Sequence, residues 1–229
     1  MAHNHHDHFA NPAAIASYVE NARRNVPGLE DLHRMVMLLL AEHARGPSHI
    51  LVVGAGGGME TRAMAEARPD WRFTGVDPSG AMLDLARQAL GPLTQRVDLL
   101  EGTVDQAPGG PFDGATCLLT MHHLDEQQRL HLLRETRARL RPGAPLVTVE
   151  HAAPSPDTSR WMSRSVAFSD RGGPDWDKAR VFGQRMAEHL TLLSAEAEQA
   201  LLQDAGFENV EMFYAAFSFR GWVATASRK

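Results

Sequence analysis

ILVVGAGGG, at residues 50–58, reads as a buried strand that runs straight into a turn made almost entirely of glycine. Four aliphatic residues in a row are typical of a strand covered on both faces of a parallel sheet. A turn with so few side chains lets a ligand approach the backbone closely. Three kinds of ligand compete for this turn: a phosphate, a dinucleotide, or a cofactor held mainly through backbone contacts.

The composition indicates one α/β domain with some accessory helices, because 43% of the 229 residues are hydrophobic and 22% are charged. A formal charge of −5 leaves no broad basic surface for a nucleic-acid backbone. The longest apolar run near the start, residues 35–41, is far shorter than the roughly 20 residues of a membrane-spanning helix. We therefore expect a cytoplasmic protein whose partners include neither nucleic acid nor membrane. The sequence does not decide between a monomer and a homodimer.

Cysteine and histidine usage gives no reason to expect a metal centre. Cys117 is the only cysteine, so one chain holds neither a disulfide nor a cysteine-based metal cluster. Residues 1–10 form a polar tract with four histidines, and such terminal tracts are normally disordered. We therefore expect a disordered His-rich tail over residues 1–10, where any bound metal is opportunistic.

Strand-like and helix-like patterns alternate from residue 49 to about residue 150, which is typical of βαβ units around a parallel sheet. The expected strands span 49–53, 71–77, 96–102, 112–120 and 145–150. The helices expected between them span 59–67, 79–90 and 125–140. Two further β-rich segments near the C-terminus, joined at Arg220, predict an antiparallel pair.

Two regions lie outside this alternation. Residues 11–45 predict an N-terminal cap of two helices, broken at Val26-Pro27-Gly28. Residues 152–193 contain two helix-like stretches with several aromatic residues, and we expect this insertion to form a lid. The main domain is then expected to span residues 46–229, with the lid inserted in it.

The residues around the glycine turn narrow the choice of ligand. A P-loop needs a lysine after its last glycine, whereas this turn continues into Met59-Glu60-Thr61. Met59 also stands where a dinucleotide turn has its last small residue, which disfavours a nicotinamide dehydrogenase. Asp77 ends the next predicted strand, and its carboxylate can accept hydrogen bonds from two ribose hydroxyls. Turn and carboxylate together indicate an adenosine-bearing cofactor.

The order and spacing of these motifs resemble the class I S-adenosylmethionine-dependent methyltransferases of the small-molecule type. Besides residues 50–58, the matching stretches are FTGVDPSGAMLDLAR (73–87), EGTVDQAP (101–108), FDGATCLLTMHHLD (112–125), LLRETRARLRPGAPLVTVE (132–150) and LLQDAGFENV (201–210). The resemblance implies an α/β fold: a Rossmann-like seven-stranded sheet with an antiparallel last strand and helices on both faces. It also implies S-adenosyl-L-methionine as cofactor and methyl transfer to a small organic molecule, with an O, N or C acceptor undecided.

The resemblance further implies which residues contact the cofactor. These are Gly54, Ala55, Gly56, Gly58, Asp77, Pro78, Met82, Thr103, Val104, Thr120 and Tyr18. The glycine turn would line the methionine part, Asp77 would hold the ribose, and Met82 would pack on the adenine. Residues 103–104 would meet the adenine edge, Thr120 would lie under the sulfonium, and the N-terminal tyrosine would cover the methyl donor.

The chain departs from the family pattern at two acidic positions. The acid often found two residues before the first glycine is Val52, and the acid often found at the adenine edge is Thr103. The ammonium group of the cofactor must then use backbone carbonyls or another acid, for which Glu60 is one candidate. The hydroxyl or the backbone amide of Thr103 can still serve the adenine.

A base is needed only when the methyl acceptor must lose a proton, because the methyl group of a sulfonium is already activated. Candidates follow the fourth and fifth predicted strands: His122 and His123 in TMHHLD, and Glu150 and His151 in VEHAA. We name the three histidines as candidate catalytic residues and expect at least one of the four residues to border the substrate. A structural role is the alternative for each of them singly.

Two other functions stay open at this point. NVPGLEDLHRM (25–35) and FYAAFSFRGWVA (213–224) are similar to carboxy-S-adenosylmethionine synthases, whose product is a heavier, modified cofactor. The other alternative is a non-catalytic partner protein that binds S-adenosylmethionine, because Val52 departs from the family pattern and no base is assigned.

Overall fold

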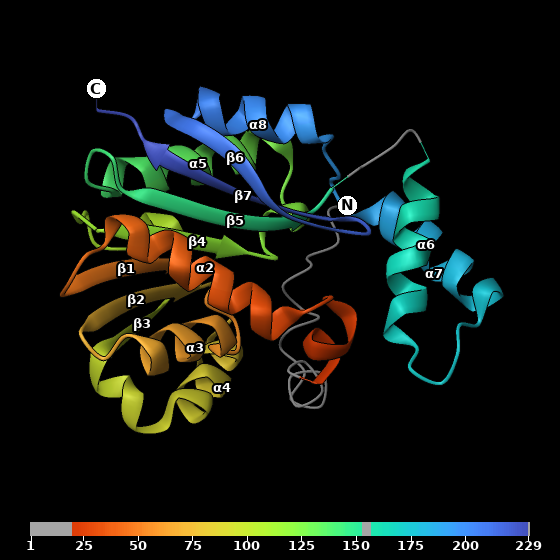
Figure 1. Ribbon diagram of the computed structural model, residues 1–229, viewed down its shortest axis with the longest axis horizontal. Helices are drawn as coiled ribbons and strands as arrows, with labels where there is room; N and C mark the ends of the chain where they lie inside the picture. Colours follow the sequence, from red (N-terminus) through yellow and green to blue (C-terminus); the bar gives the residue numbers. More distant parts are fainter. Residues whose placement is uncertain (1–19, 153–156, 229) are drawn as a thin grey trace.

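One seven-stranded sheet forms the centre of the fold (Figure 1). The computed structural model describes residues 20–152 and 157–228. The strands are β1 (Ser48–Val53), β2 (Trp71–Asp77), β3 (Val97–Glu101), β4 (Gly114–Leu118), β5 (Pro145–His151), β6 (Phe207–Ala216) and β7 (Phe219–Ala226). Their order across the sheet is β3-β2-β1-β4-β5-β7-β6.

Strand directions confirm the predicted Rossmann-like sheet. Neighbours among β1 to β5 pair in parallel, whereas β7 is antiparallel to both β5 and β6. The strand order reverses between β1 and β4, and in sheets of this kind such a reversal opens a crevice at the C-terminal ends of the two strands. The ligand site is therefore expected where the glycine turn follows β1.

Helices cover both faces of the sheet, as predicted. They are α2 (Leu29–His43), α3 (Met59–Ala67), α4 (Gly80–Leu90), α5 (Glu126–Arg139), α6 (Thr158–Ser169), α7 (Trp176–His189) and α8 (Ala195–Asp204). Residues 20–25 are also helical and end at the predicted break, Val26-Pro27-Gly28. None of the helices described is both long and apolar enough to cross a bilayer.

Alternate residues of β1 reach the two hydrophobic cores. Ile50 and Val52 pack in the core that α2, α3 and α4 cover. Leu51 and Val53 pack in the other core, with α5 and α8. A strand with both faces covered has to be apolar throughout, which explains the run of aliphatic residues before the glycine turn.

Polar side chains fix where several helices begin. The hydroxyl of Ser79 accepts a hydrogen bond from the backbone N–H of Met82 at 3.3 Å, so that α4 starts directly after Asp77. Asp125 caps α5 by accepting from Gln128 N, and the Gln128 side chain accepts from Asp125 N in return. These caps position the segments that follow β2 and β4 at the edge where the crevice opens.

Strand β4 is shorter than the strand predicted over residues 112–120. It ends at Leu118, because Leu119 adopts a positive φ of 57°, a conformation that does not continue a strand. At its other end, Phe112 forms only an isolated bridge with Leu140. The turn after β4 therefore begins before Thr120.

The C-terminal hairpin turns earlier than predicted. Phe217 and Ser218 separate β6 from β7, and Arg220 lies inside β7, paired with Glu150 in the strand register. Phe217 adopts a positive φ of 48°, which suits a two-residue hairpin turn. Neither residue is a typical turn former, so the composition gave no signal for this position.

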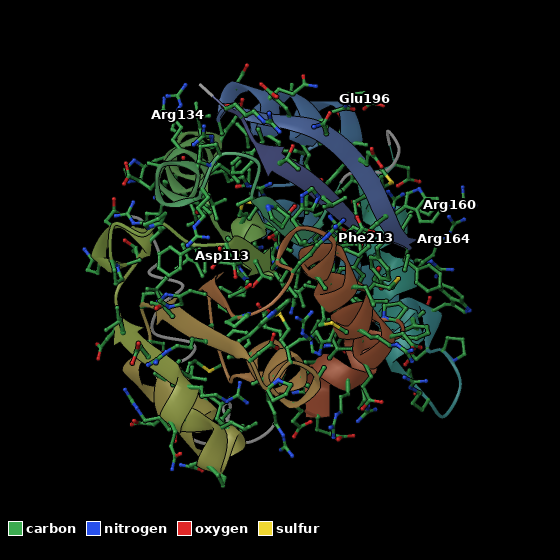
Figure 2. The ribbon with its side chains drawn as sticks, turned by 60° about the vertical axis from the view of Figure 1, so that its left-hand side comes forward. Asp113, Arg134, Arg160, Arg164, Glu196 and Phe213 are labelled. Carbon is green, nitrogen blue, oxygen red and sulfur yellow. The ribbon has the colours of Figure 1, made fainter. Side chains whose placement is uncertain are left out.

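The insertion after β5 forms a helical hairpin beside the C-terminal ends of the strands (Figure 1). Helices α6 and α7 approach closely at Gly183, where an added Cβ would lie 2.4 Å from the backbone nitrogen of Ser163. Arg160 and Arg164 of α6 lie at the edge of the molecule (Figure 2). This hairpin corresponds to the predicted lid.

Two backbone hydrogen bonds tie the hairpin to the sheet edge. Before it, the N–H of Ala152 donates to Ser218 O at 2.8 Å. After it, the N–H of Thr191 donates to His122 O at 3.0 Å. The insertion thus leaves and rejoins the main body next to the C-terminal ends of β4 and β5.

Replacing Leu40 by Ala should destabilise the fold, because Leu40 is fully buried where α2 packs on the sheet. We expect a loss of about 2 to 5 kcal/mol in the free energy of unfolding, measured by urea denaturation. Leu38→Ala is the control, since Leu38 lies on the same helix with half of its surface exposed, and it should change stability by less than about 0.5 kcal/mol. Equal effects of the two substitutions would contradict this packing.

Candidate active site

The glycine turn after β1 adopts a backbone that suits glycine. Gly54, Gly56 and Gly58 have positive φ values of 73°, 49° and 75°. A Cβ at Gly54 would lie 2.1 Å from Thr120 Oγ1, so the ends of β1 and β4 approach each other too closely for any side chain there. Gly54 is therefore required by the close approach of the two strand ends.

Asp77 connects the end of β2 to the glycine turn. One of its carboxylate oxygens accepts a hydrogen bond from the backbone N–H of Gly56 at 2.9 Å, and the other accepts from Ser79 N at 2.9 Å. Asp77 therefore holds the glycine turn in place beside the start of α4.

A small cavity lies over the glycine turn. It is lined by Ala22, Leu29, Leu32, His33, Gly54, Ala55, Gly56, Gly57, Met59, Glu60, Leu118 and Leu119. Backbone groups of the turn form one wall and apolar side chains of α2 form another. The expected ligand residues Gly54, Ala55 and Gly56 thus share one cavity with residues of the N-terminal helix.

Two ionisable side chains line this cavity, and both are buried. Glu60 Oε1 accepts a hydrogen bond from Thr116 Oγ1 at 2.6 Å, but burial outweighs this bond and raises the pKa of Glu60 to about 8. Burial likewise lowers the pKa of His33 to about 4. The sequence analysis missed His33, although it lies on the apolar face of α2 with Leu29, Leu32 and Val36, a pattern that predicts burial.

His122 and Glu150 form a buried pair beside the turn that follows β4. The Nδ1 atom of His122 lies 2.7 Å from Glu150 Oε2. Backbone N–H groups of Thr120 and His122 also donate to the Glu150 carboxylate, at 3.3 and 3.1 Å. Burial raises the pKa of Glu150 to about 7 and lowers the pKa of His122 to about 3. The imidazole is therefore neutral near pH 7.

Behind Glu150 lies a second buried acid that the sequence analysis also missed. Glu198 accepts a hydrogen bond from Trp222 Nε1 at 2.8 Å, and burial raises the pKa of Glu198 to about 7. The Arg129 guanidinium lies 3.8 Å from Glu198 Oε1 and lowers the pKa of Glu150. These groups come from α5, α8 and β7, so no local sequence pattern could have assembled them.

The other two candidate histidines have different surroundings. His151 Nδ1 lies 2.8 Å from Ser218 Oγ, and its ring stacks on Phe219 with centroids 4.0 Å apart. This position favours the structural alternative for His151, which joins β5 to the hairpin turn. His123 is exposed, with its ring centroid 4.3 Å from that of His122.

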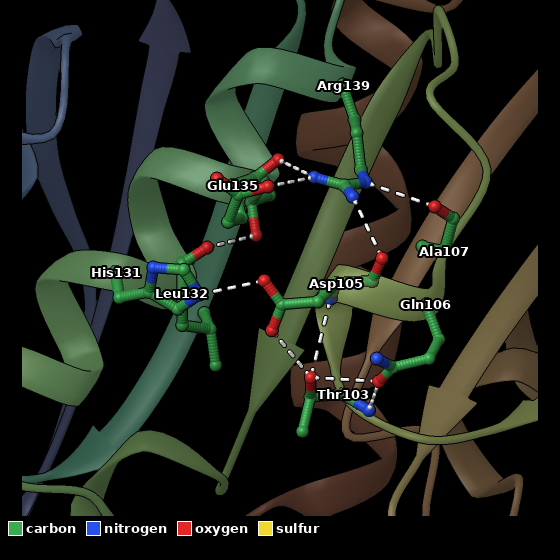
Figure 3. A network of polar contacts seen from close by, with 9 residues as sticks. Thr103, Asp105, Gln106, Ala107, His131, Leu132, Glu135 and Arg139 are labelled. Carbon is green, nitrogen blue, oxygen red and sulfur yellow. Dashed lines mark hydrogen bonds and ion pairs between the residues drawn. The ribbon is translucent and has the colours of Figure 1, made fainter.

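Thr103 forms a local capping box (Figure 3). Its backbone N–H donates to Gln106 Oε1 at 2.7 Å, and its hydroxyl donates to the Asp105 carboxylate at 2.7 Å. Both groups expected to serve the adenine edge therefore already have partners. Val104 is buried in the core on the α5 side.

The same close-up contains an exposed cluster of possible metal ligands, formed by Asp105, His131 and Glu135 (Figure 3). His131 Nε2 lies 2.8 Å from Asp105 Oδ1, and Glu135 pairs with Arg139 at 2.6 Å. These ion pairs account for the arrangement without a metal.

The remaining predicted ligand residues are placed as follows. Met82 is buried on the first turn of α4, and Pro78 is exposed after β2. Thr120 lies next to the glycine turn, where a Cβ at Gly54 would meet its side chain. Tyr18 and the tail over residues 1–10 lie outside the described residues, as does the start of the expected cap over 11–45.

Comparison with known proteins matches this geometry. Residues 51–146 match a family model described as a methyltransferase domain. A carboxy-S-adenosyl-L-methionine synthase from Chromohalobacter salexigens is 28% identical over 218 residues, covering 92% of this chain and 80% of that protein. A protein of the same name from Trichlorobacter lovleyi is 26% identical, covering 92% of this chain and 89% of that protein.

Solved structures share the fold. An O-methyltransferase family protein from Burkholderia thailandensis superposes with a TM-score of 0.66 at 16% identity, over 96% of this chain and 61% of that one. The pyocyanin biosynthetic protein PhzM gives a TM-score of 0.61 at 25% identity, over 84% of this chain and 55% of that one. This chain thus spans less than two thirds of either structure.

The sheet topology, the glycine turn with Asp77 and the matching methyltransferase domain agree with one another. The chain has the fold of the class I S-adenosylmethionine-dependent methyltransferases, enzymes that use S-adenosyl-L-methionine as cofactor, and its residues 51–146 match a methyltransferase domain.

Proposed function

We propose that this enzyme transfers the methyl group of S-adenosyl-L-methionine to a small organic acceptor that loses a proton in the reaction, and that it acts in the cytoplasm. The observation that carries the proposal is the buried His122–Glu150 pair, with Nδ1 and Oε2 2.7 Å apart, next to the turn that holds Thr120. A neutral imidazole fixed by a carboxylate is a common general base.

The cofactor would lie across the C-terminal ends of β1, β2 and β4. Asp77, whose carboxylate lies beside the glycine turn at the end of β2, would accept the ribose hydroxyls. The glycine turn would hold the methionine part in the cavity that Gly54–Gly57 line. Thr120, in contact with Gly54, would then lie under the sulfonium.

His122 would act on the acceptor through its Nε2 atom. Glu150 engages Nδ1, so Nε2 is the ring nitrogen that can receive the proton of the acceptor. His122 would gain a positive charge as it takes the proton of the acceptor. The Glu150 carboxylate, which also accepts two backbone N–H groups, would stabilise that charge.

The helical hairpin α6–α7 would close the site from outside. It leaves the body after β5 and rejoins it at the backbone of His122, so it borders the place where an acceptor would meet the methyl group. Methyl transfer depends mainly on alignment of the acceptor behind the S–CH₃ bond and on exclusion of water. A hairpin at this edge can provide both.

A second candidate function is supported by the sequence relatives. The carboxy-S-adenosyl-L-methionine synthases align with 92% of this chain, at 28% identity for the relative from Chromohalobacter salexigens. An enzyme of that kind would modify the cofactor itself rather than an acceptor. Methyl transfer remains our first proposal because the His122–Glu150 pair provides a base for an acceptor.

Product mass should separate the two candidates. We expect incubation with S-adenosylmethionine bearing a deuterated methyl group and a small-metabolite extract to yield a labelled metabolite together with S-adenosylhomocysteine, detected by mass spectrometry. Recovery of a cofactor heavier by one carboxyl group, without any labelled metabolite, would instead establish the synthase reaction.

Asp77→Ala should weaken S-adenosylhomocysteine binding by about 10- to 100-fold in isothermal titration calorimetry. The substitution removes the acceptor of the ribose hydroxyls and the bond that orders the turn at Gly56. Asp84→Ala is the control, because Asp84 is an exposed residue paired only with Arg87 on α4. Undiminished binding by Asp77→Ala would rule out this site.

His122→Gln should lower kcat by about 100-fold or more while S-adenosylhomocysteine binding stays within about threefold. His123→Gln should retain most of the activity, because His123 is exposed whereas His122 is buried against Glu150. The measurement is the rate of S-adenosylhomocysteine release with the acceptor found by the labelling experiment. A His122→Gln enzyme as fast as the wild type would exclude this base.

A further inference from the structure

We propose that Glu60 binds the α-ammonium group of the cofactor, with its carboxylate supplied from helix α3 to a place beside the apolar residue Val52 of β1. This inference rests on the proposed cofactor site. It assigns a partner to the α-ammonium group, for which β1 offers no acidic residue because Val52 stands at that position.

The position of Glu60 follows from the strand register. Val52 is paired with Thr116 across β1 and β4. The hydroxyl of Thr116 donates to Glu60 Oε1 at 2.6 Å. The Glu60 carboxylate therefore lies against the same neighbour as the Val52 side chain, although Glu60 comes from the first turn of α3.

Glu60 also faces the cavity over the glycine turn. Among the described residues that line this cavity, Glu60 is the only carboxylate and His33 is the only other ionisable group. The side chain is 8% exposed, and its one hydrogen bond, to Thr116, leaves acceptor capacity unused in the described part of the chain. A buried carboxyl group with a single hydrogen bond lowers the stability of the folded protein. A bound cation would restore that stability.

The surroundings of Glu60 define how binding should depend on pH. Burial and the nearby Glu150 raise the pKa of Glu60, which is about 8, so the side chain is mostly protonated at pH 7 in the empty site. An ammonium group favours the ionised form, so binding should release the Glu60 proton to solvent. His33 titrates near pH 4 and Cys117 well above pH 9, outside the range of interest. Glu150 titrates near 7 and needs its own control.

The test compares two ligands by isothermal titration calorimetry between pH 6 and 7.5. S-adenosylhomocysteine carries the α-ammonium group, which is mainly protonated in this range because even peptide α-amino groups titrate only at about 7.7 to 8.0. Methylthioadenosine lacks the amino-acid part. Any pH dependence of its binding therefore reports the titration of Glu150 rather than that of Glu60. We expect the affinity for S-adenosylhomocysteine to rise by up to about tenfold per pH unit, with nearly one proton released, and the affinity for methylthioadenosine to stay almost constant.

Glu60→Gln should weaken S-adenosylhomocysteine binding by about 10- to 100-fold at pH 7.5, remove its pH dependence and leave methylthioadenosine affinity within about twofold. Its melting temperature should stay close to that of the wild type, because glutamine resembles the protonated acid. Glu66→Gln is the matched control, since Glu66 lies on the same helix, exposed and paired with Arg62. If Glu60→Gln does not fold, Thr116→Val provides the test, because loss of its hydrogen bond should shift the rise in affinity to higher pH.

The outcomes separate this inference from the proposed function. Unchanged S-adenosylhomocysteine binding by Glu60→Gln, or equal pH dependence for the two ligands, would overturn the role of Glu60 while leaving the Asp77 site intact. Failure of the wild type to bind either ligand would overturn the cofactor site itself.

Discussion

The convergence of β1 and β4 is the constraint on which the site depends. Where these strands end, the backbone of Gly54 lies so close to Thr120 that no side chain fits between them. The turn is then held from the other side by Asp77, through Gly56 N. The hydrogen bond from Gly56 to Asp77 and the close contact between Gly54 and Thr120 thus shape the glycine turn, where we propose that the cofactor binds.

Buried ionisable groups gather along this edge of the sheet. Glu60, His33 and His122 are held mainly in neutral form by burial, and Glu150 has a pKa near neutrality. A cationic ligand at this edge would therefore change the electrostatics of the site as well as filling it.

Sequence patterns predicted the sheet well because its strands are short apolar runs bounded by glycine, proline or aspartate, as at Val53–Gly54 and Asp77–Pro78. They could not predict side chains paired across the fold. His122 and Glu150 stand 28 residues apart, whereas Thr103 and Gln106 have the spacing of a capping box, which does predict the local partners of Thr103. The turn at Phe217 could not be predicted either, because its positive φ occurs at a residue other than glycine or asparagine.

The helical hairpin rejoins the body through the N–H of Thr191, which donates to the carbonyl of His122. Arg129 also donates to Thr191 O from inside the core, so the junction is braced on both sides of the residue. A shift of the hairpin against the sheet would therefore pull directly on the main chain of the histidine that pairs with Glu150. Thr191 thus links the position of the hairpin to the orientation of the His122 imidazole.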